Sequence, residues 1–439
     1  MKVEEIFQVY KENIMPTYNK VPLIFVKGKG SRLWDINGKL YLDFFPGWGV
    51  GSLGHCHPKV MQGVRDQISK LIFVPNNYYH PFQAKLAKEL IYLSFPGKVF
   101  FANSGAEANE AAIKLARKFG ASTKLSANGE QSRTISASTK LSANGEQSRT
   151  ISASTKLSAN GEQSRTIGRG RYEIITFQNA FHGRTLAALA ATGQEKYQSG
   201  FEPMPEGFKQ VKFNDLAAVK QAVTDKTVAI MLELIQGEGG VNVADKDFVL
   251  ALRKLCDEKN LLLIIDEVQT GIGRTAKMFG YQHYGITPDI MTLAKALGGG
   301  LPIGVVIAKK ELSDLLTPGM HASTFGGGPV ICRAALGVFR AMQKEKILKN
   351  CQIMGEYLLG KLNLLKNAYP FIQEIRGMGL MLGVELSIEG KEIVQKCIQQ
   401  GLLINCTHDK VLRLMPALNV TKKEIDQAIG ILRSVLANR

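Results

Sequence analysis

The stretch LLLIIDEVQTGIGR, residues 261–274, indicates the fold class of this 439-residue chain. It opens with five consecutive apolar residues, 261–265, which is typical of a strand buried on both faces of a parallel sheet. The run ends at Asp266 and Glu267, so we expect both carboxylates to lie at the carboxyl end of that strand. Ligands bind at the carboxyl ends of strands in open α/β sheets. The stretch therefore predicts a binding site around Asp266.

A second stretch, DIMTLAKALGGGLPIG at residues 289–304, repeats this arrangement. A short apolar run precedes Lys295, and three glycines at residues 298–300 follow it, where bare backbone lets a ligand approach closely. Alone, a loop lysine is more often solvated, and an aspartate after a strand is more often a helix cap. Together, Lys295 and Asp266 match the needs of pyridoxal phosphate: an amine that bonds to the aldehyde and a carboxylate that keeps the pyridine nitrogen protonated. The pair indicates chemistry on amino groups.

Both stretches resemble the cofactor segments of the class III aminotransferases, which are fold-type I pyridoxal-phosphate enzymes. Within that family the chain most closely resembles the acetylornithine aminotransferases, from GSRLWDINGKLYLDF near its start to KVLRLMPAL near its end. The resemblance implies pyridoxal 5'-phosphate as the cofactor, with Lys295 and Asp266 as catalytic residues. It also implies transfer of the terminal amino group of N2-acetyl-L-ornithine to 2-oxoglutarate, giving N-acetylglutamate 5-semialdehyde and glutamate in arginine biosynthesis.

Strand and helix patterns alternate along the chain, which predicts an α/β core with a doubly wound, mostly parallel sheet flanked by helices. The expected strands are residues 99–101, 173–177, 228–234, 261–265 and 303–308. By resemblance, residues 46–329 form a large cofactor-binding domain. Residues 1–45 and 330–439, from the two ends of the chain, form a smaller α+β domain.

Composition narrows the possible partners. The net charge is +17, from 55 basic and 38 acidic residues, but the basic residues are dispersed, so we expect no nucleic-acid partner. The same charge would attract dicarboxylates such as 2-oxoglutarate and glutamate. Apolar runs too short to span a bilayer, six scattered cysteines and the acidic start MKVEEIF predict a cytoplasmic protein without a membrane partner. The segment GHCHP at residues 54–58 lacks a third ligand at suitable spacing, so we expect no metal.

One insert has no place in the resemblance. The unit ASTKLSANGEQSRTIS occurs three times in tandem at residues 121–168, with only Gly168 departing from the repeat. Each copy has only leucine and isoleucine as large apolar residues, which favours disorder. The alternative uses the Asn-Gly of each copy as a tight turn in stacked hairpins or short solenoid rungs. A non-enzymatic alternative for the whole chain follows, namely a scaffold whose repeats bind a partner.

The segment NSGAEANEAAIKLARKFG places Ser104, Gly105 and Ala106 before a good helix-forming run. A hydroxyl and free backbone N–H groups at a helix N-terminus make an anion site, although an ordinary serine cap completed by Glu107 explains the pattern as well. The resemblance assigns residues 104–106 to the cofactor phosphate.

Two segments supply further expected contacts to the cofactor and substrate: NAFHGRT and residues 267–269. In NAFHGRT, Phe181 could stack on the pyridine ring and Arg184 could grip a carboxylate, and these are their roles in the family. Relatives use the residues at Val268 and Gln269 for the other ring face and its phenolic oxygen, and we include Glu267 of the same strand end among the cofactor contacts.

In HASTFGGGP the resemblance places Ser323 beside the substrate and lets Thr324 reach the phosphate of the neighbouring subunit. The active form would then be a homodimer.

Glu238 in LELIQGEGG and Arg413 in KVLRLMPAL complete the expected substrate site. In related enzymes the glutamate neutralises the arginine until 2-oxoglutarate or glutamate brings its own carboxylate. Arg184 would hold the carboxylate of acetylornithine. Trp48 occupies a position where ornithine enzymes carry an aromatic residue, so ornithine, 4-aminobutyrate and succinyl-diaminopimelate remain alternative amino donors.

Overall fold

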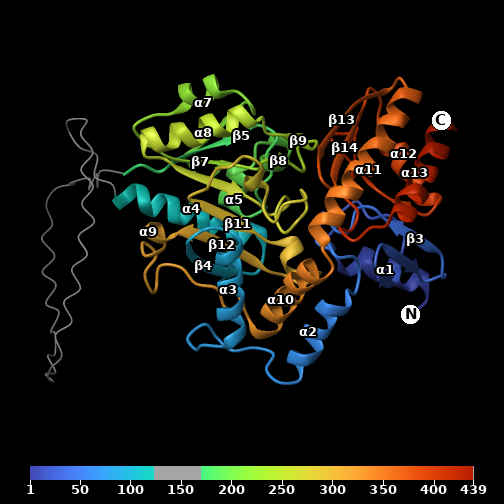
Figure 1. The fold of residues 1–439 in the computed structure, drawn as a ribbon, viewed down its shortest axis with the longest axis horizontal. Coiled ribbons are helices and arrows are strands. Elements are labelled where there is room, and N and C mark those ends of the chain that lie inside the picture. The colour runs from blue at the N-terminus through green and yellow to red at the C-terminus, as the bar shows by residue number, and fades with distance from the viewer. Residues whose placement is uncertain (123–169, 439) are drawn as a thin grey trace, which may run out of the picture.

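The protein is described by a computed structural model that covers residues 1–122 and 170–438 (Figure 1). Its helices, in chain order, are α1 (Val3–Asn13), α2 (Pro58–Ile68), α3 (Pro81–Leu93), α4 (Gly105–Ser122), α5 (Leu186–Ala191), α6 (Glu195–Gln198), α7 (Leu216–Ala222), α8 (Lys246–Lys259), the 3-10 turns η1 (Gly280–His283) and η2 (Lys295–Gly298), α9 (Lys310–Ser313), α10 (Pro329–Lys344), α11 (Ile347–Ala368), α12 (Lys391–Gln399) and α13 (Lys422–Ala437). No described helix is both long and apolar enough to cross a bilayer.

The largest sheet lies between helices and positions the site (Figure 1). Its strands, in spatial order, are β4 (Gly97–Ala102), β12 (Gly304–Lys309), β11 (Ile290–Leu293), β10 (Leu262–Asp266), β7 (Thr227–Leu232), β5 (Glu173–Phe177) and β6 (Phe208–Val211). All neighbours pair in parallel except β12, which is antiparallel to both β11 and β4. The carboxyl ends of β4, β5, β7, β10 and β11 therefore lie at one edge of the sheet.

Helices cover both faces of this sheet, which explains the unbroken apolar runs of its strands. Successive side chains of a strand point to opposite faces. Accordingly, Leu263 belongs to the same buried cluster as Val249 of α8, whereas its neighbour Ile264 belongs to the cluster of Ile113 on α4. All five residues of β10 are buried.

Three smaller sheets complete the fold. One contains β1 (Phe25–Lys29), β2 (Arg32–Asp35), β3 (Leu40–Asp43) and β15 (Leu402–Leu403); the second contains β13 (Ile372–Met378), β14 (Met381–Leu386), β17 (Val411–Leu414) and β16 (Asn405–Thr407); the third contains β8 (Ile235–Gln236) and β9 (Asn242–Val243). Strand β15 pairs in parallel with β3, so segments from both ends of the chain share a sheet, and both termini lie on that side of the molecule (Figure 1). The domain boundaries near residues 46 and 329 stay a prediction.

The expected α/β class with a mixed, mostly parallel sheet is confirmed, and the strand at residues 173–177 has the predicted bounds. The strand expected at 261–265 lies at 262–266, and it extends to Asp266 because that residue still pairs with Thr292 of β11. The strand expected at 228–234 ends earlier, because β7 spans Thr227–Leu232. The chain leaves the sheet at Glu233, whose carboxylate accepts hydrogen bonds from the N–H groups of Phe181 and Gly237.

The tandem repeats lie outside the described residues, apart from Ala121 and Ser122 at the end of α4, so the expectation of disorder is untested. The described flanks of the insert are close together. A Cβ atom on Gly170 would lie 2.5 Å from the carbonyl oxygen of Gly120 and 2.8 Å from Ala121 Cα. The chain therefore returns, after the insert, to the point where it left.

Candidate active site

A cavity of about 500 Å³ opens at the edge of the large sheet where the parallel strands end. Glu233 follows β7, Asp266 ends β10 and Lys295 follows β11, and all three line the cavity. Its wall also includes residues from the N-terminus of α4 and from the turn after β5: Ser104, Gly105, Ala106, Phe181, His182 and Arg184. The cavity thus brings together most of the residues that the sequence motifs single out.

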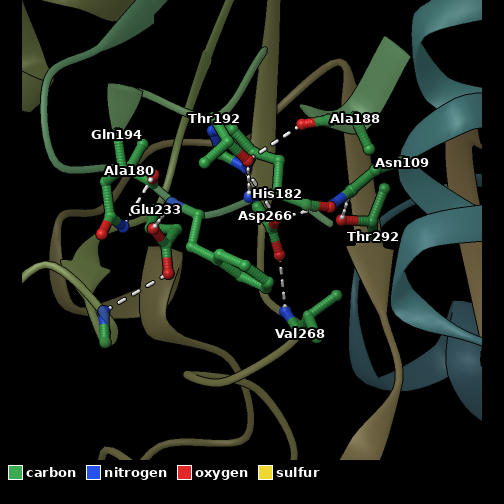
Figure 2. Close-up of polar contacts among 12 residues, drawn as sticks. Asn109, Ala180, His182, Ala188, Thr192, Gln194, Glu233, Asp266, Val268 and Thr292 are labelled. Atoms are coloured by element: carbon green, nitrogen blue, oxygen red, sulfur yellow. Dashed lines mark hydrogen bonds and ion pairs between the residues drawn. The ribbon is translucent and has the colours of Figure 1, made fainter. Parts of the chain in front are cut away.

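Asp266 is held by a buried hydrogen-bond network (Figure 2). Its Oδ2 accepts hydrogen bonds from Asn109 Nδ2 and from the His182 ring, each at 2.8 Å, and its Oδ1 accepts one from the Val268 N–H at 3.0 Å. Asn109 Oδ1 in turn accepts a hydrogen bond from the Thr292 hydroxyl at 2.8 Å. The carboxylate is only 3% exposed. A carboxylate with this many donors is fixed in orientation.

Glu233 is a second buried carboxyl group beside this network (Figure 2). It accepts hydrogen bonds from the N–H of Phe181 at 2.9 Å and of Gly237 at 3.3 Å. Burial raises the pKa of Glu233 to about 7, and the charge of Asp266 acts in the same direction, whereas His182 opposes the shift. Sequence motifs did not reveal Glu233, Asn109 or His182 as parts of the site, although His182 stands inside the string NAFHGRT.

Lys295 lies at the start of η2 with a positive φ of 41°, a conformation that non-glycine residues seldom adopt and that often marks functional positions. Burial lowers the pKa of the Lys295 amine, while the carboxylates of Glu238, Asp266 and Glu233 oppose the shift and Arg413 adds to it. A lysine with a lowered pKa is more readily neutral, and a neutral amine is the form that attacks an aldehyde or accepts a proton.

The N-terminus of α4 shows the serine cap that its sequence suggested. Ser104 Oγ accepts a hydrogen bond from the Glu107 N–H at 3.2 Å, and Glu107 Oε2 accepts one from the Asn103 N–H at 2.5 Å, so the helix is capped. Residues 104–106 nevertheless line the cavity. The cap therefore does not remove this helix end from the cavity, and the anion site at residues 104–106 stays a prediction.

Two arginines at the rim of the site have different settings: Arg184 lines the cavity, whereas Arg413 lies outside the lining but close enough to Lys295 to lower the pKa of its amine. The Arg184 guanidinium stacks at 3.9 Å from the centre of the Tyr197 ring and is exposed. Arg413, on β17, is buried and forms a bidentate ion pair with Glu238, at 2.8 Å from Nη1 to Oε1 and 3.2 Å from Nη2 to Oε2. Arg413 also donates to Asn405 Oδ1 at 2.8 Å. One arginine is therefore exposed against an aromatic ring, and the other is buried against a carboxylate.

Five of the expected site residues lie outside the cavity lining: Glu238, Glu267, Ser323, Thr324 and Arg413. The Glu267 carboxylate accepts hydrogen bonds from the Thr270 hydroxyl and from the N–H groups of η1, because consecutive residues at a strand end point to opposite sides and Asp266 points into the cavity. We therefore assign Glu267 to loop support and not to a cofactor contact. Ser323 accepts a hydrogen bond from Asn103 at 3.2 Å, at the border of the cavity, and Thr324 is exposed in the adjoining loop.

The histidines of GHCHP have local partners. His55 Nε2 lies 2.8 Å from Asp43 Oδ2, and His57 accepts the Lys59 N–H at the start of α2.

Two features of the cavity fit pyridoxal 5'-phosphate. Val268 packs directly on the backbone of Gly105, where a Cβ would lie 2.9 Å from Val268 Cγ1, so the helix N-terminus and the Val268 side chain meet in the cavity wall. The buried polar atoms Gln269 Oε1 and His182 Nε2 have no hydrogen-bond partner among the described residues. The free polar atoms, the helix N-terminus, the amine and the anchored carboxylate suit a heterocycle with a phosphate, an aldehyde and a ring nitrogen.

Comparisons with known proteins agree with this geometry. The family described as Aminotransferase class-III matches residues 14–436. Among similar curated proteins, the acetylornithine aminotransferase of Methanocaldococcus jannaschii is 47% identical over 99% of this chain and 98% of its own length. The protein of the same name from Caldanaerobacter subterraneus is 48% identical over 97% of this chain and 98% of its own length.

Solved structures extend the same relationship. The ornithine aminotransferase of Toxoplasma gondii has a TM-score of 0.86 at 30% identity and covers 100% of this chain and 96% of its own. The acetylornithine aminotransferase of Elizabethkingia anophelis has a TM-score of 0.80 at 26% identity, with 100% of both chains covered.

Proposed function

The chain belongs to the class-III aminotransferases, which depend on pyridoxal phosphate, and we propose that it transfers the terminal amino group of N2-acetyl-L-ornithine to 2-oxoglutarate. The products would be N-acetylglutamate 5-semialdehyde and glutamate. The observation that carries this choice of donor is the name shared by the curated relatives at 47% and 48% identity over nearly the whole chain.

We assign the cofactor to the cavity at the strand ends. Bound pyridoxal phosphate supplies an aldehyde that bonds to amines and a pyridine ring that withdraws electrons. Lys295 would hold it covalently, and the N-terminus of α4 would hold its phosphate through residues 104–106. Asp266, fixed by Asn109 and His182, would keep the ring nitrogen protonated. Phe181, Val268 and Gln269 would enclose the ring.

Lys295 is also the group that we assign to proton transfer. Its amine faces the cavity, and its lowered pKa favours the neutral form that can take a proton from the donor carbon bearing the amino group. The same amine, once protonated, can return the proton. One residue would thus hold the cofactor and move the proton.

The rim would distinguish the two substrates. Arg184 is exposed beside the cavity and would bind the carboxylate of acetylornithine. Arg413 is neutralised by Glu238 while the amino donor is bound, and the second carboxylate of 2-oxoglutarate would replace Glu238 in the pair. Such an exchangeable pair lets one site accept a monocarboxylate amine and a dicarboxylate in turn.

We further propose a homodimer in which Thr324 reaches the neighbouring subunit's site. Thr324 lies in an exposed loop beside Phe325, which is 64% exposed and contacts Phe73 with ring centres 5.3 Å apart. Ile72, next to Phe73, is 66% exposed. Exposed apolar residues that cluster in this way mark interaction surfaces. Sedimentation that finds an active monomer at micromolar concentration would rule the dimer out as a requirement.

Free ornithine is the second candidate donor, and one structural observation favours it. Trp48 contacts Phe45 with ring centres 5.7 Å apart, and Phe45 lies 4.8 Å below the Arg413 guanidinium. Phe45 therefore borders the ion pair, and Trp48, at the position where ornithine enzymes carry an aromatic residue, packs against Phe45.

Steady-state kinetics with 2-oxoglutarate held constant decides among the donors. We expect kcat/KM for acetylornithine to exceed that for ornithine, 4-aminobutyrate and succinyl-diaminopimelate by about 10-fold or more, a typical discrimination for one substrate group. A higher kcat/KM for ornithine would overturn the proposed donor but leave the reaction class intact.

A further inference from the structure

Arg274 links the loop after β10 to the sheet that carries Arg413. Its side chain is fully buried, at 0% exposure, and Nη1 donates hydrogen bonds to the carbonyl oxygens of Leu380 at 3.0 Å and Pro416 at 2.6 Å. The Leu380 N–H donates in return to the Arg274 carbonyl oxygen at 3.2 Å. Three hydrogen bonds therefore join one residue of the loop to two distant segments.

The two acceptor carbonyls lie at the same end of the β14–β17 ladder. These strands are antiparallel, with Leu382 opposite Leu414 and Gly383 opposite Arg413. Leu380 lies two residues before Leu382, and Pro416 lies two residues after Leu414. A single guanidinium nitrogen thus ties both sides of the ladder, three residues from Arg413.

The loop that carries Arg274 is itself anchored next to Asp266. Glu267, the residue after Asp266, accepts hydrogen bonds from the N–H groups of Gly280 at 2.9 Å and Tyr281 at 2.7 Å, which close the loop. Within the loop, the Gly273 N–H donates to the Met278 carbonyl oxygen at 3.1 Å. Asp266 and Arg274 are therefore held in a fixed relation.

The charge of Arg274 is costly where it lies. No carboxylate pairs with it among the residues that the structure describes, in contrast to Arg413, which has Glu238. Burial lowers the pKa of Arg274 to about 10, so the side chain still carries its charge near neutral pH. A buried charge that only carbonyl groups compensate contributes little to stability, which favours a positioning role.

We propose that Arg274 is a positioning residue that holds Arg413 at a set distance from Asp266 and so determines the affinity for the dicarboxylate substrate. This inference rests on the proposed role of Arg413 in binding 2-oxoglutarate. It assigns no contact with a substrate to Arg274, which acts through the ends of β14 and β17.

The test compares the KM values of the two substrates in Arg274→Met and Arg274→Lys. Methionine removes every donor but suits the buried surroundings, and we expect KM for 2-oxoglutarate to rise by about 10-fold or more, within the cost of a small misplacement. KM for the amino donor and kcat should change by less than about 3-fold, because the cofactor end of the site is untouched. Arg274→Lys keeps a charged donor on a shorter side chain, so it should raise KM for 2-oxoglutarate less than Arg274→Met does. If Arg274→Met does not fold, the two KM values are compared in Arg274→Lys alone.

Two control variants separate the possible outcomes. Arg413→Lys should also raise KM for 2-oxoglutarate, whereas Arg253→Lys, on α8 away from the cavity, should change neither KM. If Arg413→Lys raises this KM but the Arg274 variants raise both KM values equally or leave both unchanged, the positioning role is wrong and the proposed function stands. If Arg413→Lys leaves KM for 2-oxoglutarate unchanged, the proposed role of Arg413 fails, and the inference about Arg274 fails with it.

Discussion

The cavity has a floor and a rim that are built in different ways. The floor consists of Asp266 at the end of β10, His182 in the turn after β5 and Asn109 on α4; all three are buried and hydrogen-bonded to one another. The rim, Arg184 and Arg413, is held by partners that a substrate could replace: the face of the Tyr197 ring and the carboxylate of Glu238. A fixed floor suits a cofactor that stays, and an exchangeable rim suits two substrates that alternate.

The largest expected effect comes from removing the amine above the floor. Lys295→Ala should lower turnover by at least about 10³-fold, because the change removes both the covalent attachment and the proton carrier. Turnover with acetylornithine and 2-oxoglutarate measures the loss, and circular dichroism checks that the variant is folded. A variant that keeps more than a tenth of the turnover would contradict the central role of Lys295.

The floor can be tested with a matched pair of substitutions. Asp266→Asn keeps the shape but removes the charge that would protonate the ring nitrogen, so kcat should fall by about 10²-fold or more. Asp43 is the control, because it is also buried and accepts hydrogen bonds from a histidine, His55, and from the N–H of the residue two positions on, Phe45. Asp43→Asn should lower kcat by less than about 10-fold. Equal losses in both variants would mean that Asp266 acts only through local structure.

Substitutions in the rim should change KM and leave kcat nearly unchanged. Arg184→Lys loses the planar fork that grips a carboxylate and should raise KM for the amino donor by about 10-fold, with little change for 2-oxoglutarate. Glu238→Gln removes the carboxylate charge that the substrate would have to displace from the buried Arg413, so KM for 2-oxoglutarate should fall. If both variants mainly lower kcat, the rim is part of the fixed machinery and the contrast with the floor is lost.

Glu233, beside the floor, should make the free energy of unfolding depend on pH. Its pKa is raised from 4.5 to about 7 by burial, so between these values the folded protein keeps a proton that the unfolded chain releases. The free energy of unfolding therefore falls as pH rises through this window, by up to about 3 kcal/mol. Glu233→Gln lacks the titration, so its stability relative to the wild type should increase between pH 4.5 and pH 7 in denaturant unfolding. A constant difference across this window would show that Glu233 is ionised throughout.

The smallest effect is expected for the insert, which belongs to neither region. Excising residues 121–168 should leave kcat within about 2-fold of the wild type, because Gly120 and Gly170 already lie in backbone contact and the flanks can be joined by a short turn. A large loss of turnover in a folded deletion variant would give the repeats a part in catalysis.

Local sequence predicted the parts of the site that depend on strand ends and helix starts. Asp266, Lys295 and residues 104–106 were found because an apolar run or a helix pattern fixes where each lies. Asn109 and Glu233 were missed, because their roles arise only when α4 and the end of β7 meet β10 in space. Arg274 was likewise missed, because its partners lie more than a hundred residues away.

Covalent trapping tests the central claim most directly. The loaded enzyme is reduced with borohydride, digested, and its peptides are mapped by mass spectrometry. The account predicts a single pyridoxyl adduct on Lys295, lost in Lys295→Ala. An adduct on another lysine, or none at residue 295, would contradict the assignment of the cavity as the cofactor site.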